Sequence, residues 1–411
     1  MMAGPQALLW SINARAVLEA VDTLGPTGRP ELVQETGLSK TTVAQALQEL
    51  LARGVVREAG LDTERRGPAA TLYGTDPGGG YAIGVDVEVE RVTAVLVDLA
   101  GAEVARASRP TTGVAQGVAQ VVAEVVAEVV SELVTEPATE LVTELVTELV
   151  TEPATELVTE LVTAPDAELV TAPVDGVRVG QVVIGVPALV ARDGRSIRAS
   201  RGLPGAAHLG AELQTLLPYP VLLENDVNLA AVAEQRRGAG RGVDDFVLLR
   251  VGTGLGAGVV IGGRLHRGFA GGAGEVGFLP HPATALGGEV LGARQIGQVA
   301  RELGVEGSPA ELFARAAAGE ASALAVAGAV ARRLAHVIGA IALVIEPELF
   351  VVGGPGTEVL LEPVRRHLAA DAPDLVVGVT GSGVPGDAVL QGAALVAHEH
   401  VRERVFTEAT T

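Results

Sequence analysis

An amide and a carboxylate stand side by side where an apolar run ends, and this pairing can bind a polyol. Asn225 and Asp226 follow residues 221–223, Val-Leu-Leu, which are typical of a buried strand. Such a pair can hydrogen-bond sugar hydroxyls, and a carboxylate can also accept the proton of a hydroxyl nucleophile. The two side chains can equally form an Asx turn that caps a helix predicted for 227–234, and the two roles are compatible.

A glycine-rich stretch supplies further candidate groups. Residues 252–258 read Gly-Thr-Gly-Leu-Gly-Ala-Gly, and their backbone N–H groups can cradle a phosphate or simply permit a tight turn. Glu275 stands between glycines in an apolar loop that needs no charge for solubility. We therefore take Glu275 as a candidate hydrogen-bond acceptor for a ligand, with an ordinary surface acid as the alternative.

Residues 29–58 carry a different chemistry, that of DNA contact. Pro30 fits the first turn of a short helix, Gly37 its left-handed exit, and Ser39 the N-cap of a second helix. Two helices with a short turn, followed by strands on either side of 64–68, predict a winged helix-turn-helix over 1–75; a generic helical hairpin is the alternative. The expected DNA contacts include the only lysine of the chain and two wing arginines: Ser39, Lys40, Thr41, Thr42, Gln45, Arg65 and Arg66.

Charge is distributed unevenly along the 411 residues, whose net charge is −20. Residues 1–75 hold seven basic and eight acidic side chains, whereas 131–170 hold ten acids and no base. The head is thus nearly neutral and can still approach phosphates. The chain has no cysteine, which excludes disulfides and thiolate zinc sites, and no uncharged run of 18 apolar residues, so we expect a cytoplasmic protein without a membrane partner.

Residues 131–170 form a low-complexity insert in which Thr-Glu-Leu-Val recurs. We interpret this insert as a tolerated repeat expansion; a helical extension that pairs with a partner and a coiled-coil arm are the alternatives. From 182 onward, apolar strands that end in glycine or acidic loops alternate with helical spacings. This alternation predicts an α/β body with ligands at the strand ends.

The order of these motifs resembles that of the ROK family, which contains sugar-responsive repressors and sugar kinases. The resemblance follows the winged head and four segments: IGVD at 83–86, ENDVNLAAVAE at 224–234, the glycine-rich signature at 251–277 and VVGGPG at 351–356. It implies a two-lobed, actin-like (ribonuclease-H-type) ATPase-fold body. We expect the first lobe at 80–188 and the second at 189–411, with the C-terminal helix returning to the first lobe.

The resemblance also places functional residues. Asn225, Asp226 and Glu275 fall on sugar-binding positions, and Asp226 on that of the kinase base. Relatives that bind ATP carry glycines and a hydroxyl residue after the aspartate of IGVD, whereas this chain has Glu88 and Glu90, two carboxylates that would repel a polyphosphate.

The zinc cluster of many relatives is also missing from the sequence. Phe278 stands at its histidine position, no cysteine follows, and His281 nearby is more typical of a surface residue than of a ligand. We therefore expect no metal, no cofactor and no enzymatic activity.

These observations favour a DNA-binding transcriptional repressor that senses a sugar or sugar derivative and binds a double-stranded operator as a homodimer or homotetramer. One alternative is an active ATP-dependent sugar kinase with a DNA-binding head. Another alternative is a regulator that has lost its small ligand and responds to a protein partner.

Overall fold

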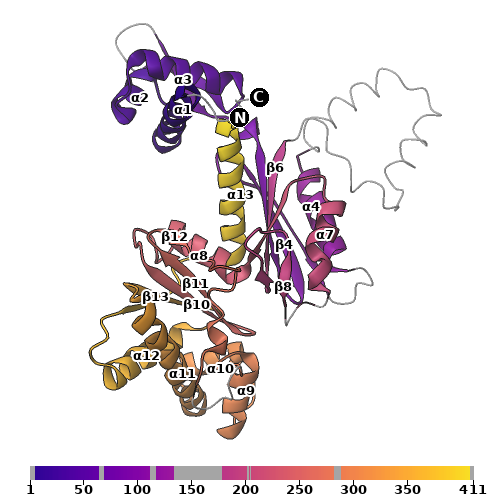
Figure 1. Cartoon of the computed structure of the whole chain (residues 1–411), viewed down its shortest axis with the longest axis vertical. Coiled ribbons are helices and arrows are strands. Elements are labelled where there is room, and N and C mark those ends of the chain that lie inside the picture. Colours follow the sequence, from indigo (N-terminus) through magenta and orange to yellow (C-terminus); the bar gives the residue numbers. More distant parts are fainter. Residues whose placement is uncertain are drawn as a thin grey trace, which may run out of the picture. The chain divides into compact units, whose positions relative to one another are not determined.

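The computed structural model describes residues 5–63, 69–111, 117–133, 178–200, 203, 205–281 and 288–407 (Figure 1). The wing loop with Arg65 and Arg66, and most of the low-complexity insert, lie outside these ranges. The chain divides into two compact units. The first comprises Met1–Ile184, Leu209–Leu222 and Ala393–Thr411, and the second comprises Gly185–His208 and Leu223–Gly392.

The first unit begins with three helices and a two-stranded antiparallel sheet. The elements are α1 Pro5–Leu24, α2 Arg29–Thr36, α3 Lys40–Ala52, β1 Val56–Asp62 and β2 Ala70–Thr75. The local signals in the sequence are confirmed here. Pro30 lies in the first turn of α2, Gly37 ends that helix with a φ of 66°, and the Ser39 hydroxyl accepts a hydrogen bond from the Thr42 N–H at 3.1 Å.

A five-stranded sheet forms the rest of the first unit and continues to the start of the second, in the order β5-β4-β3-β6-β9. Its strands are β3 Tyr81–Val87, β4 Arg91–Asp98, β5 Glu103–Pro110, β6 Val179–Val186 and β9 Val221–Asn225. Helices α4 (Val118–Ser131) and α7 (Ala206–Leu216) lie to one side of this sheet, and α13 (Ala388–Thr407) lies to the other (Figure 1). Strands β3 and β4 pair as an antiparallel hairpin, which the two apolar runs at 81–87 and 92–98 predict.

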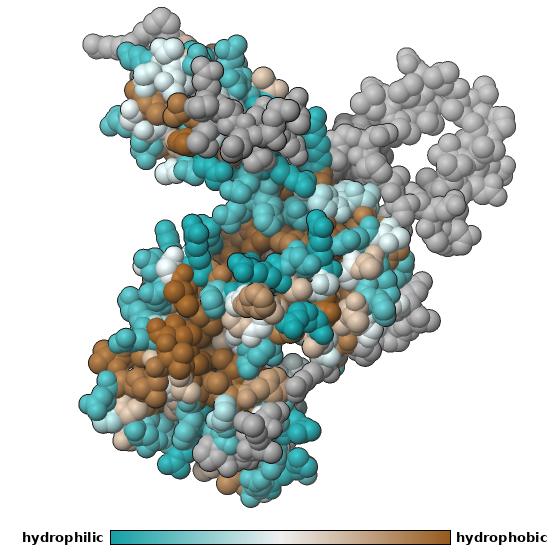
Figure 2. Space-filling model, in the orientation of Figure 1, coloured by the Kyte–Doolittle hydropathy of each residue, from teal (hydrophilic) through white to brown (hydrophobic). Residues whose placement is uncertain are grey.

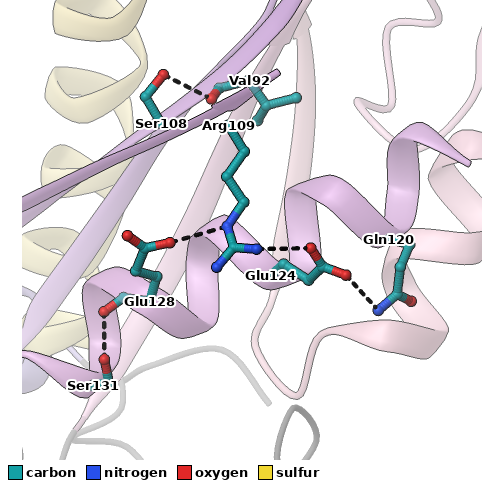
Figure 3. Close-up of polar contacts among 7 residues, drawn as sticks. All are labelled: Val92, Ser108, Arg109, Gln120, Glu124, Glu128 and Ser131. Carbon is teal, nitrogen blue, oxygen red and sulfur yellow. Dashed lines mark hydrogen bonds and ion pairs between the residues drawn. The ribbon is translucent and has the colours of Figure 1, made fainter. Parts of the chain in front are cut away.

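Polar contacts fix α4 against the edge of this sheet. The Arg109 guanidinium of β5 donates to Glu124 at 3.2 Å and to Glu128 at 3.0 Å, two carboxylates one helical turn apart on α4 (Figure 3). On its inner side α4 buries a valine stripe that includes Val122 and Val126. Because Arg109 is about half exposed, the ion pairs orient α4, while burial of the valines provides most of the stabilisation.

Helix α13 connects the sheet of the first unit to the three-helix head. Gly84 of β3 lies so close to α13 that an added Cβ would come within 2.4 Å of the Ala394 backbone nitrogen. Further along the helix, the Arg53 guanidinium donates to the Val405 carbonyl at 2.5 Å and stacks over the Trp10 ring at 4.2 Å. One end of α13 is therefore attached to the head through the Arg53 side chain.

Residues 76–80, whose proline and three glycines are typical of a linker, are ordered. Their central residues form a short 3₁₀ helix, Pro77–Gly79, capped by the Asp76 carboxylate. A Cβ on Gly79 would lie within 2.3 Å of the Gly54 carbonyl oxygen, so the segment packs tightly against the head. Position 79 therefore requires glycine, because the backbones of Gly79 and Gly54 lie too close for a side chain between them.

The second unit contains a five-stranded sheet in the order β12-β11-β10-β13-β14. Its strands follow the chain in the same pattern as those of the first sheet. Its strands are β10 Phe246–Val251, β11 Leu255–Ile261, β12 Arg264–Leu265, β13 Leu349–Gly353 and β14 Gly378–Gly381. In each five-stranded sheet two antiparallel hairpin partners extend the first strand on one side, and two later strands extend it on the other. This repetition agrees with the expected two-lobed α/β body.

Successive residues of β11 face opposite sides of this sheet. Gly256 and Gly258 meet α8 (Asp226–Arg237) on one face, whereas Ala257 and Val259 join the core cluster on the other. That cluster is completed by α9 Ala293–Glu302, α10 Pro309–Ala317, α11 Ala321–Ile345 and α12 Glu358–Asp371. Helix α8, which begins at the candidate site, is thus packed directly on the sheet.

Substituting Gly84 tests how tightly α13 is seated. We expect Gly84→Ala to lower the free energy of unfolding by roughly 3 kcal/mol, since backbone atoms of α13 would have to move to accept the methyl group. Gly297→Ala is the matched control: that glycine lies in α9 with open space around it, so the same change should be neutral or stabilising by about 0.5–1 kcal/mol. Thermal unfolding measures both, and equal midpoints for the two variants would contradict the packing.

Candidate functional site

The Asn225 side chain hydrogen-bonds backbone groups at the junction of β9 and α8. Its side-chain oxygen accepts hydrogen bonds from the N–H groups of Val227 at 3.0 Å and Asn228 at 3.1 Å, which makes it the N-cap of α8. Its amide nitrogen donates to the Ala188 carbonyl at 3.2 Å. The capping role considered from the sequence is therefore present. These three hydrogen bonds orient the Asn225 amide. A ligand at Asn225 would use the hydrogen-bonding capacity that remains.

Asp226, the next residue, is held by an arginine. Its Oδ1 accepts from the Val227 N–H at 2.9 Å, and its Oδ2 receives a hydrogen bond from Arg250 at 3.2 Å. Arg250 lies on β10, where it is the charged residue of an otherwise apolar strand, and both side chains are partly buried. A sugar hydroxyl at Asp226 would therefore share the carboxylate with a guanidinium, which partly neutralises it.

Glu224, a buried carboxylate on β9, contacts the residues around Asn225 and Asp226. We call this region the Asn225–Asp226 corner. Glu224 accepts from the Asn225 N–H and from the Asn228 side chain, both at 2.9 Å, through one oxygen. Its other oxygen receives a hydrogen bond from Arg267 at 2.5 Å. Glu224 is 6% exposed, so Arg267 provides the charge compensation that a buried carboxylate requires. Since Arg267 belongs to the glycine-rich signature, this pair joins that signature to the Asn225–Asp226 corner.

Glu275 lies on a loop that glycines fix to the sheet. Gly274, with a φ of 94°, approaches β11 so closely that a Cβ would stand 2.0 Å from the Ala257 carbonyl oxygen, and its own carbonyl accepts from the Ala257 N–H at 2.8 Å. Gly277 similarly meets the Leu255 carbonyl. Glu275 is exposed between these anchors. Adjacent residues of β11 therefore support both parts of the site, because Gly256 contacts Val227, next to Asp226.

The glycine run 252–258 forms the turn and second strand of a hairpin. Gly256 and Gly258 are required by packing, since Cβ atoms there would come within 2.7 Å of Val227 and 2.4 Å of Ala231 in α8. At the turn, a Glu289 carboxylate oxygen lies 3.1 Å from the position of a Cβ on Gly254. A carboxylate beside this turn would repel a phosphate, which favours the turn reading of the run over the phosphate-binding one.

In the first unit, Glu88 and Glu90 occupy the turn between β3 and β4. The Glu88 N–H donates to the Arg91 carbonyl at 2.8 Å, and both glutamate side chains are exposed. Two carboxylates therefore follow Asp86 on this turn, as the sequence indicated.

The residues around the family's zinc position do not fit that metal. Phe278 lies in the 3₁₀ helix Val276–Phe278 and offers no ligand atom. His281 is half-buried, and its ring packs edge-on against His336 at 5.4 Å between centroids. Within the ranges that the structure covers, no group of three or more His, Cys, Asp or Glu side chains is arranged to hold a metal ion.

The candidate DNA contacts of α3 divide into two groups. Lys40, Thr41 and Gln45 are exposed on its outward side, and its inward side buries an apolar stripe that includes Leu47. Ser39 and Thr42 are engaged in the helix cap, with their hydroxyls 2.8 Å apart.

Sequence reasoning missed the polar and charged partners of the site: Glu224, Asn228, Arg250, Arg267 and Glu289. Glu224 and Asn228 flank the chosen pair in the sequence, and a glutamate in a buried strand is itself a signal. Arg250 interrupts an apolar strand, which is a second such signal. Arg267 and Glu289 carry no local signal, because their contacts join segments that are distant along the chain.

Comparisons with known proteins match the chain to one family and to several relatives. The family model described as ROK family matches residues 138–400. The chain is 34% identical over 189 residues to the bifunctional enzyme NanE/NanK of Brucella suis, which covers 44% of the chain and 36% of that enzyme. It is 23% identical over 274 residues to the xylose repressor of Bacillus subtilis, covering 67% of the chain and 62% of the repressor. The chain thus spans less than two thirds of either relative.

Among solved structures, a ROK family transcriptional regulator described as a homologue of the E. coli MLC protein superposes with a TM-score of 0.66. The alignment covers 98% of this chain and all of that one, at 21% identity. The similarity shows a shared fold, including the helical head.

Removing Arg267 tests the link between the signature and the Asn225–Asp226 corner. We expect Arg267→Ala to destabilise the protein by about 3 kcal/mol, because the buried Glu224 carboxylate would lose its cation. Arg264→Ala, on exposed β12, removes the same charge without that pair and should change stability by less than about 0.5 kcal/mol. A thermal midpoint of Arg267→Ala that matches the control would show that Glu224 does not depend on this arginine.

Proposed function

Because this chain belongs to the ROK family, we propose that it is a DNA-binding transcriptional repressor whose kinase-like body senses a sugar or sugar derivative. In this proposal it acts in the cytoplasm, as a homodimer or homotetramer on a double-stranded operator. The observation that carries the proposal is the capped helix α3 with its exposed polar side, within a head of three helices and a hairpin.

The head has the parts that a winged helix-turn-helix requires. Helices α2 and α3 are separated by the three residues 37–39, and α3 leads directly into the hairpin of β1 and β2. Because α3 buries one side in the head, its N-terminal half can present Lys40, Thr41 and Gln45 to a major groove. Lysine and glutamine suit a phosphate and a base edge respectively.

Several carboxylates support a sensor rather than a kinase. Glu88 and Glu90 occupy the turn after β3, and Glu289 lies beside the Gly254 turn. One like-charge contact at about 4 Å costs roughly 1 kcal/mol in water and about 4 kcal/mol at an effective dielectric of 20. Two or more such contacts would remove useful affinity for ATP.

The polar corner at the start of α8 supports a neutral ligand. Asp226 and Glu275 can accept hydrogen bonds from sugar hydroxyls, while Arg250 can donate one to a ring or hydroxyl oxygen. A sugar bound to this corner regulates DNA binding to the extent that it prefers one conformation of the protein over another.

An active sugar kinase with a DNA-binding head is the second candidate. It is favoured by Asp226, at the position that the resemblance gives to the kinase base, and by the similarity of the chain to the bifunctional enzyme NanE/NanK. The pairing of Asp226 with Arg250 counts against it, because a base must accept a proton from the substrate hydroxyl and this carboxylate is already engaged.

Two substitutions on α3 separate phosphate contact from base reading. Lys40→Ala should weaken binding to every DNA sequence and reduce the salt slope by about one unit. Gln45→Ala should instead relax the preference at one operator position, by about 1–3 kcal/mol of discrimination. Fluorescence anisotropy with operator and scrambled duplexes across salt concentrations measures both. A chain that lacks residues 1–75 and binds the operator as tightly as the whole protein would overturn the proposal.

Asp226→Asn tests the sugar site. We expect this change to preserve the fold and DNA binding but to abolish or strongly weaken the effect of sugar, since the charged acceptor is lost. Calorimetry across hexoses, amino sugars and pentoses identifies the ligand, and operator titrations with that ligand measure the response. If the variant binds the ligand with unchanged affinity, the assignment of this site is wrong.

The same sugar panel, incubated with ATP, distinguishes sensor from kinase. We expect no phosphorylated product above the level of the Asp226→Asn protein. Turnover comparable to that of ordinary sugar kinases, at about 1–100 per second, would establish the enzyme instead.

A further inference from the structure

Two hollows adjoin one another at helices α11 and α12 of the second unit, one basic and one apolar. The basic hollow has a volume of about 730 Å³ and the apolar recess about 400 Å³. Three histidines line both of them: His281, His336 and His367. Each volume lies in the range of roughly 300–1,000 Å³ that is typical of small-molecule sites. The two hollows share no lining residue with the Asn225–Asp226 corner.

Basic side chains from three segments of the chain meet in the first hollow. His281 follows the 3₁₀ helix Val276–Phe278, three of the residues lie on α11, and His367 lies on α12; those on α11 are Arg332, Arg333 and His336. The His281 ring packs edge-on against His336, so the first two segments are in contact. Of the described residues that line this hollow, none is acidic. Such a gathering is unexpected in a chain whose net charge is −20.

The charges in this hollow are not compensated by carboxylates. Arg333 donates a hydrogen bond to the Val290 carbonyl at 3.3 Å, and neither Arg332 nor Arg333 forms a salt bridge with a residue that the structure describes. Burial lowers the pKa of His281, and the charges of His336 and Arg333 lower it further. The hollow therefore has a positive potential that an anion would relieve.

Small residues leave room for a ligand beside the two arginines. Gly328 and Ala329 line the hollow one helical turn before Arg332 and Arg333. A Cβ on Gly328 would meet no atom within 4 Å, so the space over this turn of α11 is open. An anionic group can therefore approach the helix closely, between the arginines and the histidines.

The adjoining recess lies at the apolar end of α11. Most of this helix is core: it buries Val330 and Leu334, and by length and composition it is the one helix in the described ranges that resembles a membrane span. At its C-terminal end, however, Leu343 is 78% exposed at the edge of the recess, which Leu368 and Leu375 also line. Figure 2 shows hydrophobic surface gathered over this part of the second unit. Burial in the core does not explain this apolar end.

We propose that the two hollows together bind one small amphiphilic anion, with its carboxylate or phosphate head at Arg332 and Arg333 and its apolar tail in the recess. The histidines at the boundary can donate N–H groups to the head. Asp371, the one acid among the described residues of the recess, does not line the basic hollow, so the head belongs at the arginine end. This site adds a second ligand to the proposed function and depends on neither sugar nor DNA.

Calorimetry of the full chain with butanoate, hexanoate and octanoate tests the tail. Each added pair of methylenes should tighten binding roughly fifteenfold, because each buried methylene contributes about 0.8 kcal/mol. Octyl glucoside has the same tail without a charge and should bind at least roughly tenfold more weakly than octanoate. Octyl phosphate, run beside octanoate, distinguishes the two heads. The proposal is overturned if neither of these anions binds saturably, or if octyl glucoside binds as tightly as they do.

A carboxylate placed in the basic hollow tests the head. Gly328→Asp should weaken octanoate binding at least roughly tenfold, since an acid would stand beside the arginines. Gly297→Asp is the matched control: it adds the same charge at a glycine of α9 that also has open space around it, and it should bind octanoate like the wild type. Thermal unfolding shows whether both variants are folded. Equal octanoate affinity in the two folded variants would rule out the head position.

Filling the recess tests the tail separately. A Cβ on Gly339 would lie 3.9 Å from a Leu375 methyl group, which is an ordinary contact, so Gly339→Leu can place its side chain in the recess. We expect this variant to lose the preference for octanoate over butanoate and to keep weak binding of butanoate. Arg332→Gln should instead weaken both acids by a similar factor. A folded Gly339→Leu that retains the wild-type preference for octanoate would show that the tail lies elsewhere.

Discussion

The direct packing of α8 on β11 is the constraint on which the candidate site depends. Gly256 and Gly258 allow helix and strand backbones to approach until there is no room for a Cβ. This approach fixes the first turn of α8, and with it Asp226, relative to β10 and its Arg250. Gly274 fixes the loop of Glu275 to the same strand. Candidate ligand-binding groups on three separate segments thus share one support.

Electrostatics adds a second level of organisation. Glu224 is buried, and it binds the backbone of Asn225, the side chain of Asn228 and the guanidinium of Arg267 at once. A buried carboxylate satisfied on both oxygens holds its partners in one geometry, because any partner that moves leaves a charge uncompensated. The partly buried Asn225 and Asp226 therefore lie next to a network that cannot easily rearrange.

Much of this organisation could be predicted from local sequence. Ser39 and Gly37 marked helix boundaries because caps depend on a few neighbouring residues, and the strands of the body followed from their apolar runs. The order of motifs identified the family, which the match over residues 138–400 confirms. The partners Arg267 and Glu289 could not be predicted, since each meets a segment far away in the chain. The close packing of residues 76–80 could not be predicted either, because close approach of two backbones leaves no signal in composition.

Helix α13 imposes a condition on how this family member can change over time. Its Ala394 is seated over Gly84, and its Val405, three turns later, is held by Arg53 of the head. Each residue of an α-helix turns by about 100°, so inserting or deleting one residue between these points would rotate the second contact to another side of the helix. Point substitutions along α13 leave this helical phase intact. The contact with the head therefore depends on the number of residues between the two attachments more than on which exposed residues stand there.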